Sequence, residues 1–342
     1  MQIRLAQPSS GLDWNAYVAA TPGGTFYHLH EWADINRQSF GHKAFMLEGV
    51  RDGRVAGVLP LTLVTSLPFG RILCSMPFVN YAGPCSEDAG ASKALATEAT
   101  ELARRHNARY LELRCAAPLD TDLAVSTRKI SMTIGLTADP DQIWNAYSSK
   151  HRTNIRRSYK NELSVTSGSL DLLDVFYAVM EQSWRDLGTP LYARSYFERI
   201  LRTFPDQTRI FVCRRREEPV AVAFNGYFGD TVEGMWAGGT AAARGLQANY
   251  VLYWEMLQDA CRRGFKHYHL GRSTADSGAE DFKRKWNAES RQLYWYTYRP
   301  DGQPPAELNV DNPKFRLAIA AWRKLPLWAT RVLGPMISRG IP

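Results

Sequence analysis

The chain has 342 residues, of which 45% are hydrophobic, 22% are charged and 12% are aromatic, and its net charge is +8. This composition is typical of a folded protein and excludes disorder over most of the chain, while the length favours two domains or one large duplicated unit. No stretch approaches the roughly 20 consecutive apolar residues that a membrane-spanning helix needs.

The five cysteines indicate a reducing compartment. Their number is odd and no pair has the spacing of metal ligands, so we interpret them as free, mostly buried thiols and expect no bound metal. The first residues also lack an apolar core of signal-peptide length. We therefore expect a cytoplasmic protein. The sequence has neither a Walker loop nor a nucleophile elbow, which disfavours nucleotide hydrolases and serine hydrolases.

The first half of the chain predicts a helix, a hairpin, a second helix and a strand, in that order. The first helix covers residues 31–40 and precedes a hairpin over 43–64, whose turn is Asp52-Gly53, a strong hairpin signal between apolar runs. Apolar residues at helical spacing over 94–107 predict the second helix, which leads into a strand over 108–114.

The second half repeats this order. A helix over 196–204 precedes a hairpin over 208–228, and an amphipathic helix over 251–264 leads into a strand over 265–272. Corresponding elements are offset by nearly the same number of residues, which indicates an internal duplication. The predicted fold class is α/β, of the α+β kind, with two tandem units whose mixed, mostly antiparallel sheets are flanked by helices. We predict an N-terminal domain over 1–138, a basic linker helix over 139–162, a C-terminal domain over 163–300 and a basic helical extension over 301–342.

The linker is expected to begin at the N-cap Asp139, with Pro140 in the first helical position. Its second part, KHRTNIRRSYK, carries five positive charges and no acid. Arg152 and Arg156 lie four residues apart and hence on one helix face. We expect them to bind substrate phosphates in a groove between the halves, on a cofactor pyrophosphate, a sugar nucleotide, a tRNA backbone or an anionic lipid. A solvated helix face is the alternative.

The C-terminal extension is basic. It holds six basic residues and no acidic one after Asp311, and Pro326 predicts a break into two short helices. We interpret it either as helices packed across the C-terminal domain or as a basic amphipathic element on an anionic membrane surface.

Two stretches carry a resemblance to a known family. SKHRTNIRRSYKNELSV resembles the R-x-N-I-R-(R/K) helix that links the two halves of FemAB-like proteins, and LGRSTADSGAEDFKRKWNAE resembles their second signature, a strand, a Gly/Ser loop and a helix carrying F-K. TFYHLHEWADINRQSFGHK and GPMISRG also resemble the FemAB-like subgroup associated with exosortase and exopolysaccharide systems. The resemblance implies two GNAT-like domains that transfer an acyl group, with acyl-CoA or aminoacyl-tRNA as donor and no metal.

The second signature supplies the central site candidates. The resemblance places Phe282 and Lys283 near the acyl donor, and a lysine there could stabilise charge on a reacting ester or phosphate. The alternative is a solvated face formed by Lys283, Arg284 and Lys285.

Two further candidates lie at the end of the strand over 265–272 and just after it. Arg272 is expected to contact the acceptor or a phosphate, because charges at strand ends beside Gly-containing loops commonly face a site. Ser273 shares this loop and is either a substrate contact or, with Asp276, a cap of the following helix.

Three residues are candidates for a general base. His267 and His269 alternate with Tyr268 along the strand, so both point to one side of it. Glu233 lies on the strand where GNAT enzymes sometimes keep a base, as the resemblance implies. A buried histidine with a structural partner is the alternative for either histidine.

The cofactor loop departs from the GNAT pattern. CoA-dependent members carry R/Q-x-x-G-x-G/A before a helix, where main-chain N–H groups hold pyrophosphate. The corresponding stretch here keeps Arg244, Gly245 and Gln247 as candidate cofactor contacts but lacks the second glycine. This departure favours a FemAB-like protein over an ordinary acetyltransferase.

These features together predict an acyltransferase. It would pass an acetyl or aminoacyl group to an amine or hydroxyl of a cell-envelope glycan or its precursor, in exopolysaccharide biosynthesis, at a peripheral position on the inner face of the membrane. One alternative is an aminoacyl-tRNA-dependent peptidyltransferase that acts on a peptidoglycan precursor. A degenerate GNAT pair that binds polyanionic glycan carriers, tRNA or membrane without chemistry is the non-enzyme alternative.

Overall fold

The computed structural model describes residues 1–7, 10–66, 69–275, 277–303 and 313–341, without the side chains of 313–315. The chain divides into two compact units. Unit 1 holds residues 1–131 and the later segments that start at Arg291 and Arg339, and unit 2 holds residues 132–290 and the segment that ends at Ser338.

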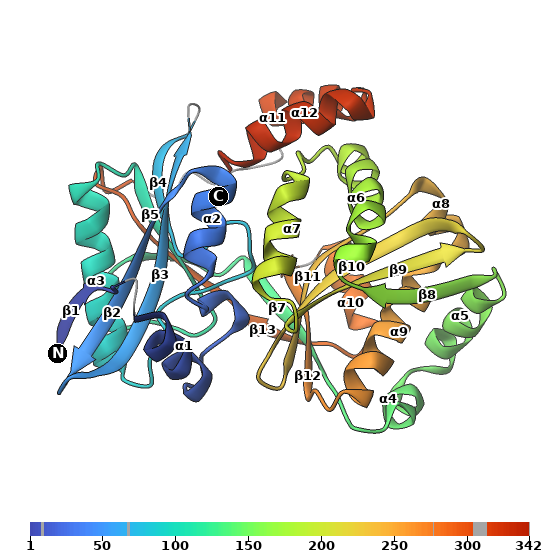
Figure 1. Cartoon of the computed structure of the whole chain (residues 1–342), viewed down its shortest axis with the longest axis horizontal. Coiled ribbons are helices and arrows are strands. Elements are labelled where there is room, and N and C mark those ends of the chain that lie inside the picture. Colours follow the sequence, from blue (N-terminus) through green and yellow to red (C-terminus); the bar gives the residue numbers. More distant parts are fainter. Residues whose placement is uncertain (8–9, 67–68, 276, 304–312, 342) are drawn as a thin grey trace. The chain divides into compact units, whose positions relative to one another are not determined.

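The described part of unit 1 is built on a sheet of seven strands in the order β1-β2-β3-β4-β5-β14-β6 (Figure 1). Its strands are β1 Gln2–Leu5, β2 Lys43–Arg51, β3 Arg54–Ser66, β4 Gly70–Cys74, β5 Tyr110–Cys115, β6 Ala124–Ser126 and β14 Tyr294–Tyr298. Its helices are α1 Gly11–Ala20, η2 Phe26–His28, α2 Trp32–Phe40 and α3 Ala89–Arg105.

Helix α3 closes one face of this sheet. Its apolar stripe buries Leu95, Ala99 and Leu102 against Leu59 and Leu111 from the strands. Burying one leucine side chain contributes on the order of 1.5–3 kcal/mol, so this stripe is the main reason that α3 stays on the sheet. Helices α1 and α2 cover the other face (Figure 1).

The described part of unit 2 contains a second sheet of seven strands, in the order β13-β7-β12-β11-β10-β9-β8. Its strands are β7 Lys129–Gly135, β8 Leu163–Gly168, β9 Thr208–Arg215, β10 Glu218–Phe228, β11 Thr231–Gly239, β12 His267–Thr274 and β13 Glu289–Gln292. Its helices are α4 Pro140–Ala146, α5 Ser149–Tyr159, η3 Leu170–Leu172, α6 Leu173–Leu187, α7 Arg194–Thr203, α8 Ala241–Leu246, α9 Ala248–Arg262, α10 Gly278–Arg284, α11 Pro313–Arg323 and α12 Leu327–Ser338. Helices α6 and α7 lie on one face of the sheet and α9 lies on the other (Figure 1).

The two sheets share one topology. In unit 1, β2, β3 and β4 form an antiparallel meander, α3 follows, and β5 pairs parallel with β4. In unit 2, β9, β10 and β11 form the meander, α9 follows, and β12 pairs parallel with β11. The predicted α+β fold with mixed, mostly antiparallel sheets and a repeated order of elements is confirmed.

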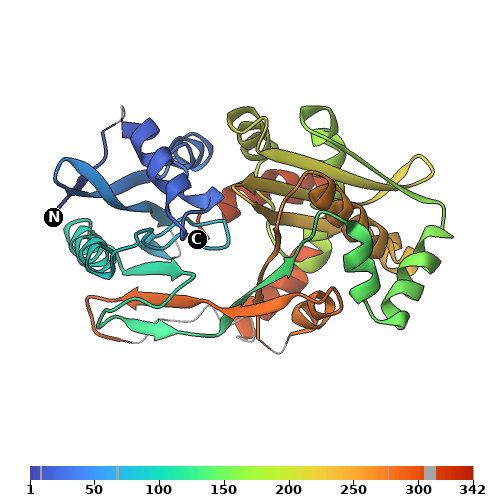
Figure 2. The ribbon, with the colours of Figure 1, turned by 90° about the horizontal axis from the view of Figure 1, so that it is seen from below.

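The first sheet takes one strand from a distant part of the sequence. β14 lies between β5 and β6 of the first sheet and pairs antiparallel with both, although it follows all the strands of the second sheet in the chain. β7 lies between β12 and β13 of the second sheet, although it directly follows β6. Figure 2 shows the β7 and β13 segments running side by side. The predicted boundary at residue 300 assigned β14 to the second half; the predicted domain limits stay a prediction.

The linker contains two helices where the sequence predicted one over 139–162. Asp139 does cap α4, since its carboxylate accepts a hydrogen bond from the Asp141 N–H at 2.9 Å. Tyr147 then adopts an extended conformation, and the Ser148 hydroxyl accepts a bond from the His151 N–H and starts α5. A second N-cap within the segment is the physical reason that a single helix was wrong.

The C-terminal segment is split as predicted. Pro326 lies between α11 and α12, and both helices pack against α6. Within the described residues, every helix is too short or too polar to cross a membrane.

Candidate functional site

Strands β11 and β12 meet for a short distance and then part. They pair in parallel from Thr231 with His267 to Glu233 with His269, while both strands continue, to Gly239 and to Thr274. A bulge shifts the register of β11 against β10 just past Glu233. A bulge bends its strand, and the ladder between β11 and β12 ends at this level, so main-chain groups here can be offered to a third molecule.

Gly234 is required at this crossing of the strands. A Cβ at this position would lie 2.9 Å from the main-chain oxygen of His269, closer than real Cβ contacts come. A larger residue at Gly234 would therefore push β12 away from β11.

Glu233 and His269 form a buried pair across these two strands. Glu233 Oε2 lies 2.7 Å from His269 Nδ1, and each residue is 2% exposed. With Glu233 ionised, Nδ1–H is the donor, so Nε2 carries the lone pair and can accept a proton. Sequence reasoning named both residues as separate candidates, and the strand register brings them together. His267 lies at the exposed start of β12.

Lys283 is buried, so the interpretation of residues 283–285 as one solvated face is wrong for it. The side chain is 9% exposed, whereas Arg284 and Lys285 are exposed. Lys283 Nζ donates to the main-chain oxygens of Gly271 at 2.9 Å and Arg272 at 3.0 Å. Burial, followed by the charge of Arg272, lowers the pKa of Lys283 to about 8.

The Lys283 ammonium holds β12 at a bend. Gly271 has a φ of 76°, a left-handed conformation that glycine adopts without steric cost, and its carbonyl is one of the two that Lys283 bonds. This bend comes two residues after His269. Lys283 therefore fixes the main chain next to the Glu233–His269 pair.

Ser273 belongs to β12 and not to the loop that the sequence predicted, and Arg272 lies in the same strand, near the end at which the sequence placed it. Arg272 is half-buried and Ser273 is 6% exposed. The Ser277 hydroxyl caps α10 by accepting a bond from the Glu280 N–H at 3.4 Å, so Ser273 is not the cap. Asp276 lies outside the described residues.

Phe282 contributes to an aromatic cluster between α9 and α10. Its ring lies 5.3 Å from that of Tyr253, and the fully buried Trp286 lies 4.5 Å from the ring of His151. Burial, followed by the charge of Lys285, lowers the pKa of His151 to about 4, so this imidazole is neutral near pH 7. Sequence reasoning missed His151. The signal that could have found it is its position three residues after the N-cap Ser148, on the first turn of the helix, from which a side chain can point into the protein.

The two arginines of the linker have different surroundings. Arg152 Nη1 donates to the main-chain oxygens of Asn145 at 3.0 Å and Tyr147 at 2.9 Å, which closes the end of α4. Arg156 is exposed, with its guanidinium 5.2 Å from the ring centre of Trp144. Arg152 thus supports the turn between α4 and α5, while Arg156 is open to a ligand. A groove between the halves stays a prediction.

The three cofactor candidates lie at the junction of α8 and α9. Arg244 and Gly245 are exposed on α8, and Gln247 joins the helices with a φ of 56°. The Gln247 side chain accepts a bond from the Ser158 hydroxyl at 3.3 Å, which ties the junction to α5. The junction stands before the N-terminus of α9, where main-chain N–H groups favour an anion; cofactor binding here stays a prediction.

The cysteines offer no activated nucleophile. All five are free and buried, and burial raises the pKa values of the Cys85 and Cys213 thiols to about 12. Among the described residues, no cluster of His, Cys, Asp and Glu could hold a metal ion.

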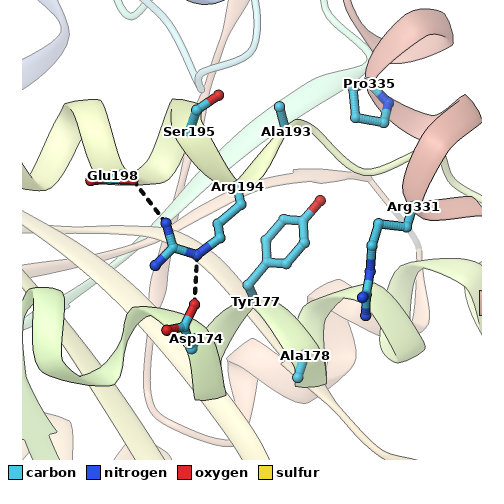
Figure 3. A pocket seen from close by; sticks show the side chains of 9 residues that line it. All are labelled: Asp174, Tyr177, Ala178, Ala193, Arg194, Ser195, Glu198, Arg331 and Pro335. Atoms are coloured by element: carbon cyan, nitrogen blue, oxygen red, sulfur yellow. Dashed lines mark hydrogen bonds and ion pairs between the residues drawn. The ribbon is translucent and has the colours of Figure 1, made fainter. Parts of the chain in front are cut away.

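A separate pocket of about 540 Å³ lies between α6, α7 and α12 (Figure 3). Arg194 on its wall bonds Asp174 at 2.6 Å and Glu198 at 2.8 Å, and Arg331 and Pro335 come from α12. None of its lining residues belongs to β11, β12 or α10, so this pocket is distinct from the site around His269.

Residues 149–284 match the family model for the acetyltransferase (GNAT) domain. A search of the curated proteins finds no match. Among solved structures, FemX is similar at 15% identity, covering 87% of this chain and 98% of that chain, with a TM-score of 0.65. L-PGS from Bacillus licheniformis is similar at 14% identity, over 99% and 98% of the two chains, with a TM-score of 0.53. A tandem GNAT protein from the clavulanic acid biosynthesis pathway is similar at 13% identity, over 89% and 100%, with a TM-score of 0.53.

The family match and the described site cover the same part of the chain. The matched segment contains Glu233, His269 and Lys283, and the likeness to the solved structures extends the shared fold to both units. Residues 149–284 therefore resemble the acetyltransferase (GNAT) domain, and the solved structures show that the chain shares the fold of FemX and of a tandem GNAT protein.

Proposed function

We propose that this enzyme transfers an acetyl or aminoacyl group to an amine, or less favourably a hydroxyl, of a cell-envelope glycan or its precursor in exopolysaccharide biosynthesis. The observation that carries the proposal is that the Glu233–His269 pair and the side chain of Lys283 both contact β12 within a few residues of each other. The Glu233–His269 pair lies where β11 and β12 part, and Lys283 fixes the bend that follows. Acyl transfer needs a base for the acceptor and fixed dipoles around the reacting carbonyl, and this arrangement supports both.

The proposed chemistry is direct transfer. The acceptor nitrogen attacks the carbonyl carbon of the donor ester or thioester, a C–N bond forms, and the C–O or C–S bond breaks. His269 takes the proton that the nitrogen loses, and the departing oxygen or sulfur is protonated in turn. Glu233 holds the imidazole in the required tautomer. The buried thiols, with their raised pKa values, support a route without a cysteine intermediate.

Two donors fit different observations. The match to the acetyltransferase (GNAT) domain model, together with the fold shared with a tandem GNAT protein, favours an acyl-CoA. The exposed basic residues on and just after α5, among them Lys150, Arg157 and Lys160, favour a phosphate-rich donor such as aminoacyl-tRNA. With that donor and a peptidoglycan precursor as acceptor, the enzyme would be a peptidyltransferase, which is the second candidate function.

The test supplies each donor in labelled form. Purified enzyme is incubated with labelled acetyl-CoA or labelled aminoacyl-tRNA, together with sugar-nucleotide or lipid-linked glycan precursors, and the products are separated by chromatography. We expect label on an acceptor with the wild type and its loss with His269→Ala. The His267→Ala variant is the matched control and should keep activity. Label bound covalently to the protein, or activity unchanged in His269→Ala, would contradict the proposed mechanism.

We also propose a cytoplasmic enzyme that works at the inner face of the membrane. The five free cysteines support a reducing compartment. Glycan precursors on lipid carriers are presented at that surface, so the proposed acceptor and the proposed location agree.

A further inference from the structure

Helix α12 turns an apolar face away from the protein. Trp328 is 72% exposed, Met336 65% and Val332 60%, and Leu333 and Ile337 are also exposed. Trp328, Val332 and Met336 follow one another at intervals of four residues and so form a single row along the helix. These five residues are called the outer face of α12.

The opposite face of α12 is fixed on unit 2. A Cβ at Gly334 would lie 2.9 Å from the main-chain oxygen of Leu191, and the Ser338 hydroxyl donates to that oxygen at 3.3 Å. Arg331 makes two hydrogen bonds of 2.7 Å to the buried carboxylate of Glu181 on α6. Figure 3 shows Arg331 and Pro335, both on α12, lining one side of the pocket. Turning the outer face inward would break these contacts and leave Glu181 buried without its partner.

The segment that carries the outer face is basic. Arg316, Arg323 and Lys324 are exposed on and after α11, and the sequence has no acidic residue after Asp311. The charge of Arg331 is matched by Glu181 from α6. An apolar row in a basic segment that lacks acids is complementary to a surface that is apolar inside and negative outside.

We propose that the outer face of α12 docks on an anionic lipid surface, with the helix lying in the plane of the interface. Trp328 suits this position, because indole rings favour the boundary between headgroups and acyl chains. A second copy of the chain fits less well. The exposed charges of this segment, Arg316, Arg323 and Lys324, are all positive, and α11 and α12 hold no acid that could pair with them across a twofold contact.

The experiment is vesicle co-sedimentation of the full chain. Vesicles of phosphatidylcholine alone are compared with vesicles that also contain phosphatidylglycerol. We expect the wild type to sediment with the anionic vesicles, less so as salt rises. The double variant Trp328→Ser/Met336→Ser should bind at least about tenfold more weakly, because two large apolar side chains no longer enter the interface. Lys324→Glu should weaken binding to the anionic vesicles and leave binding to the neutral ones unchanged.

The matched control is Leu12→Ser, which removes an apolar side chain that is 86% exposed on α1. It should bind vesicles like the wild type. The proposal is overturned if the wild type does not sediment with anionic vesicles at low salt, or if the double variant binds as well as Leu12→Ser does. It is also overturned if the wild type dimerises in sedimentation velocity, the double variant is monomeric and both bind vesicles equally, since the outer face would then belong to a second copy. These results are independent of acyl transfer when that activity is measured with the soluble sugar-nucleotide acceptors.

Discussion

Glu233 and His269 lie on neighbouring parallel strands with Oε2 and Nδ1 2.7 Å apart, at the last residue pair of the ladder between β11 and β12. The imidazole that would accept a proton therefore lies where the two strands separate. Removing either member should therefore affect chemistry more than substrate affinity.

The first prediction concerns this pair. His269→Ala should lower kcat by about 10²–10⁴-fold, the usual contribution of a positioned general base. Glu233→Gln should lower kcat as well, and the double variant should be little worse than His269→Ala alone, because the two residues act as one unit. Steady-state kinetics with His267→Ala as control would measure this. Additive losses would show that the residues act separately.

The second prediction concerns Lys283. Lys283→Ala should reduce turnover by about 10²–10³-fold, comparable to the loss of one positioned donor. It should also lower the melting temperature, because the buried carbonyls of Gly271 and Arg272 lose their donor, at a cost of about 1–3 kcal/mol for each unsatisfied group. Lys285→Ala, an exposed lysine of the same helix end, is the control for both readouts. A stable Lys283→Ala variant would mean that water replaces the ammonium.

The third prediction concerns alkaline pH. The pKa of Lys283 is lowered from 10.5 to about 8 in the folded protein, chiefly by burial. Between these values the unfolded chain binds the proton and the folded chain does not, so Lys283 makes stability rise with pH through this window. The gain is on the order of 3 kcal/mol, since each unit of pKa corresponds to about 1.4 kcal/mol. Urea unfolding at a series of pH values, compared with Lys283→Met, isolates it; identical pH slopes would contradict the shift.

The fourth prediction concerns β14. Thr297 is 6% exposed and pairs with Glu112 of β5 and Ala124 of β6. Thr297→Pro should destabilise the protein by about 3 kcal/mol or more, because proline cannot donate within a central strand. Thr297→Val keeps the shape and the N–H and should cost far less. Thermal unfolding of both variants decides the matter, and equal losses would place the cost in the hydroxyl.

The fifth prediction separates the two linker arginines. Arg152→Ala should lower stability by about 1.5–3 kcal/mol, because its charged group bonds two carbonyls at the end of α4. Arg156→Glu should leave stability near wild type but weaken binding of a phosphorylated donor or acceptor, with a smaller salt dependence. Filter binding and thermal unfolding measure the two effects. Unchanged binding in Arg156→Glu at low salt would assign Arg156 to a solvated face.

Local signals in the sequence predicted much of the fold. The turn at Asp52-Gly53 has both residues at positive φ, as its type requires, and Asp139 and Pro326 mark a helix start and a helix break where predicted. Each of these outcomes depends on a few neighbouring residues. Hydrophobic periodicity predicted the helices for the same reason: which face of a helix is buried is set by the spacing of its own apolar residues.

Contacts between residues far apart in the sequence could not be predicted. The residues of Tyr294–Tyr298 do not indicate pairing with β5 and β6, because a strand pattern does not specify the partner strand. Glu233 and His269 stood as separate candidates because only the register of β11 on β12 joins them. Lys283 was interpreted beside two other basic residues, and its burial depends on how α10 is placed against β12.

The place of β14 in the first sheet also sets an order of events during synthesis. β5 and β6 have been made by residue 126, but the strand that joins them begins only at Tyr294. At a translation rate of about 5–20 residues per second, the ribosome needs roughly ten to thirty seconds to reach it. During that interval β5 presents an open edge and β6 has no strand to hold it, while the chain of unit 2 is being made. An open edge of this kind is a site for wrong pairing, so the nascent chain should depend on chaperones most in this interval. A polypeptide released before Tyr294 could never complete its first sheet.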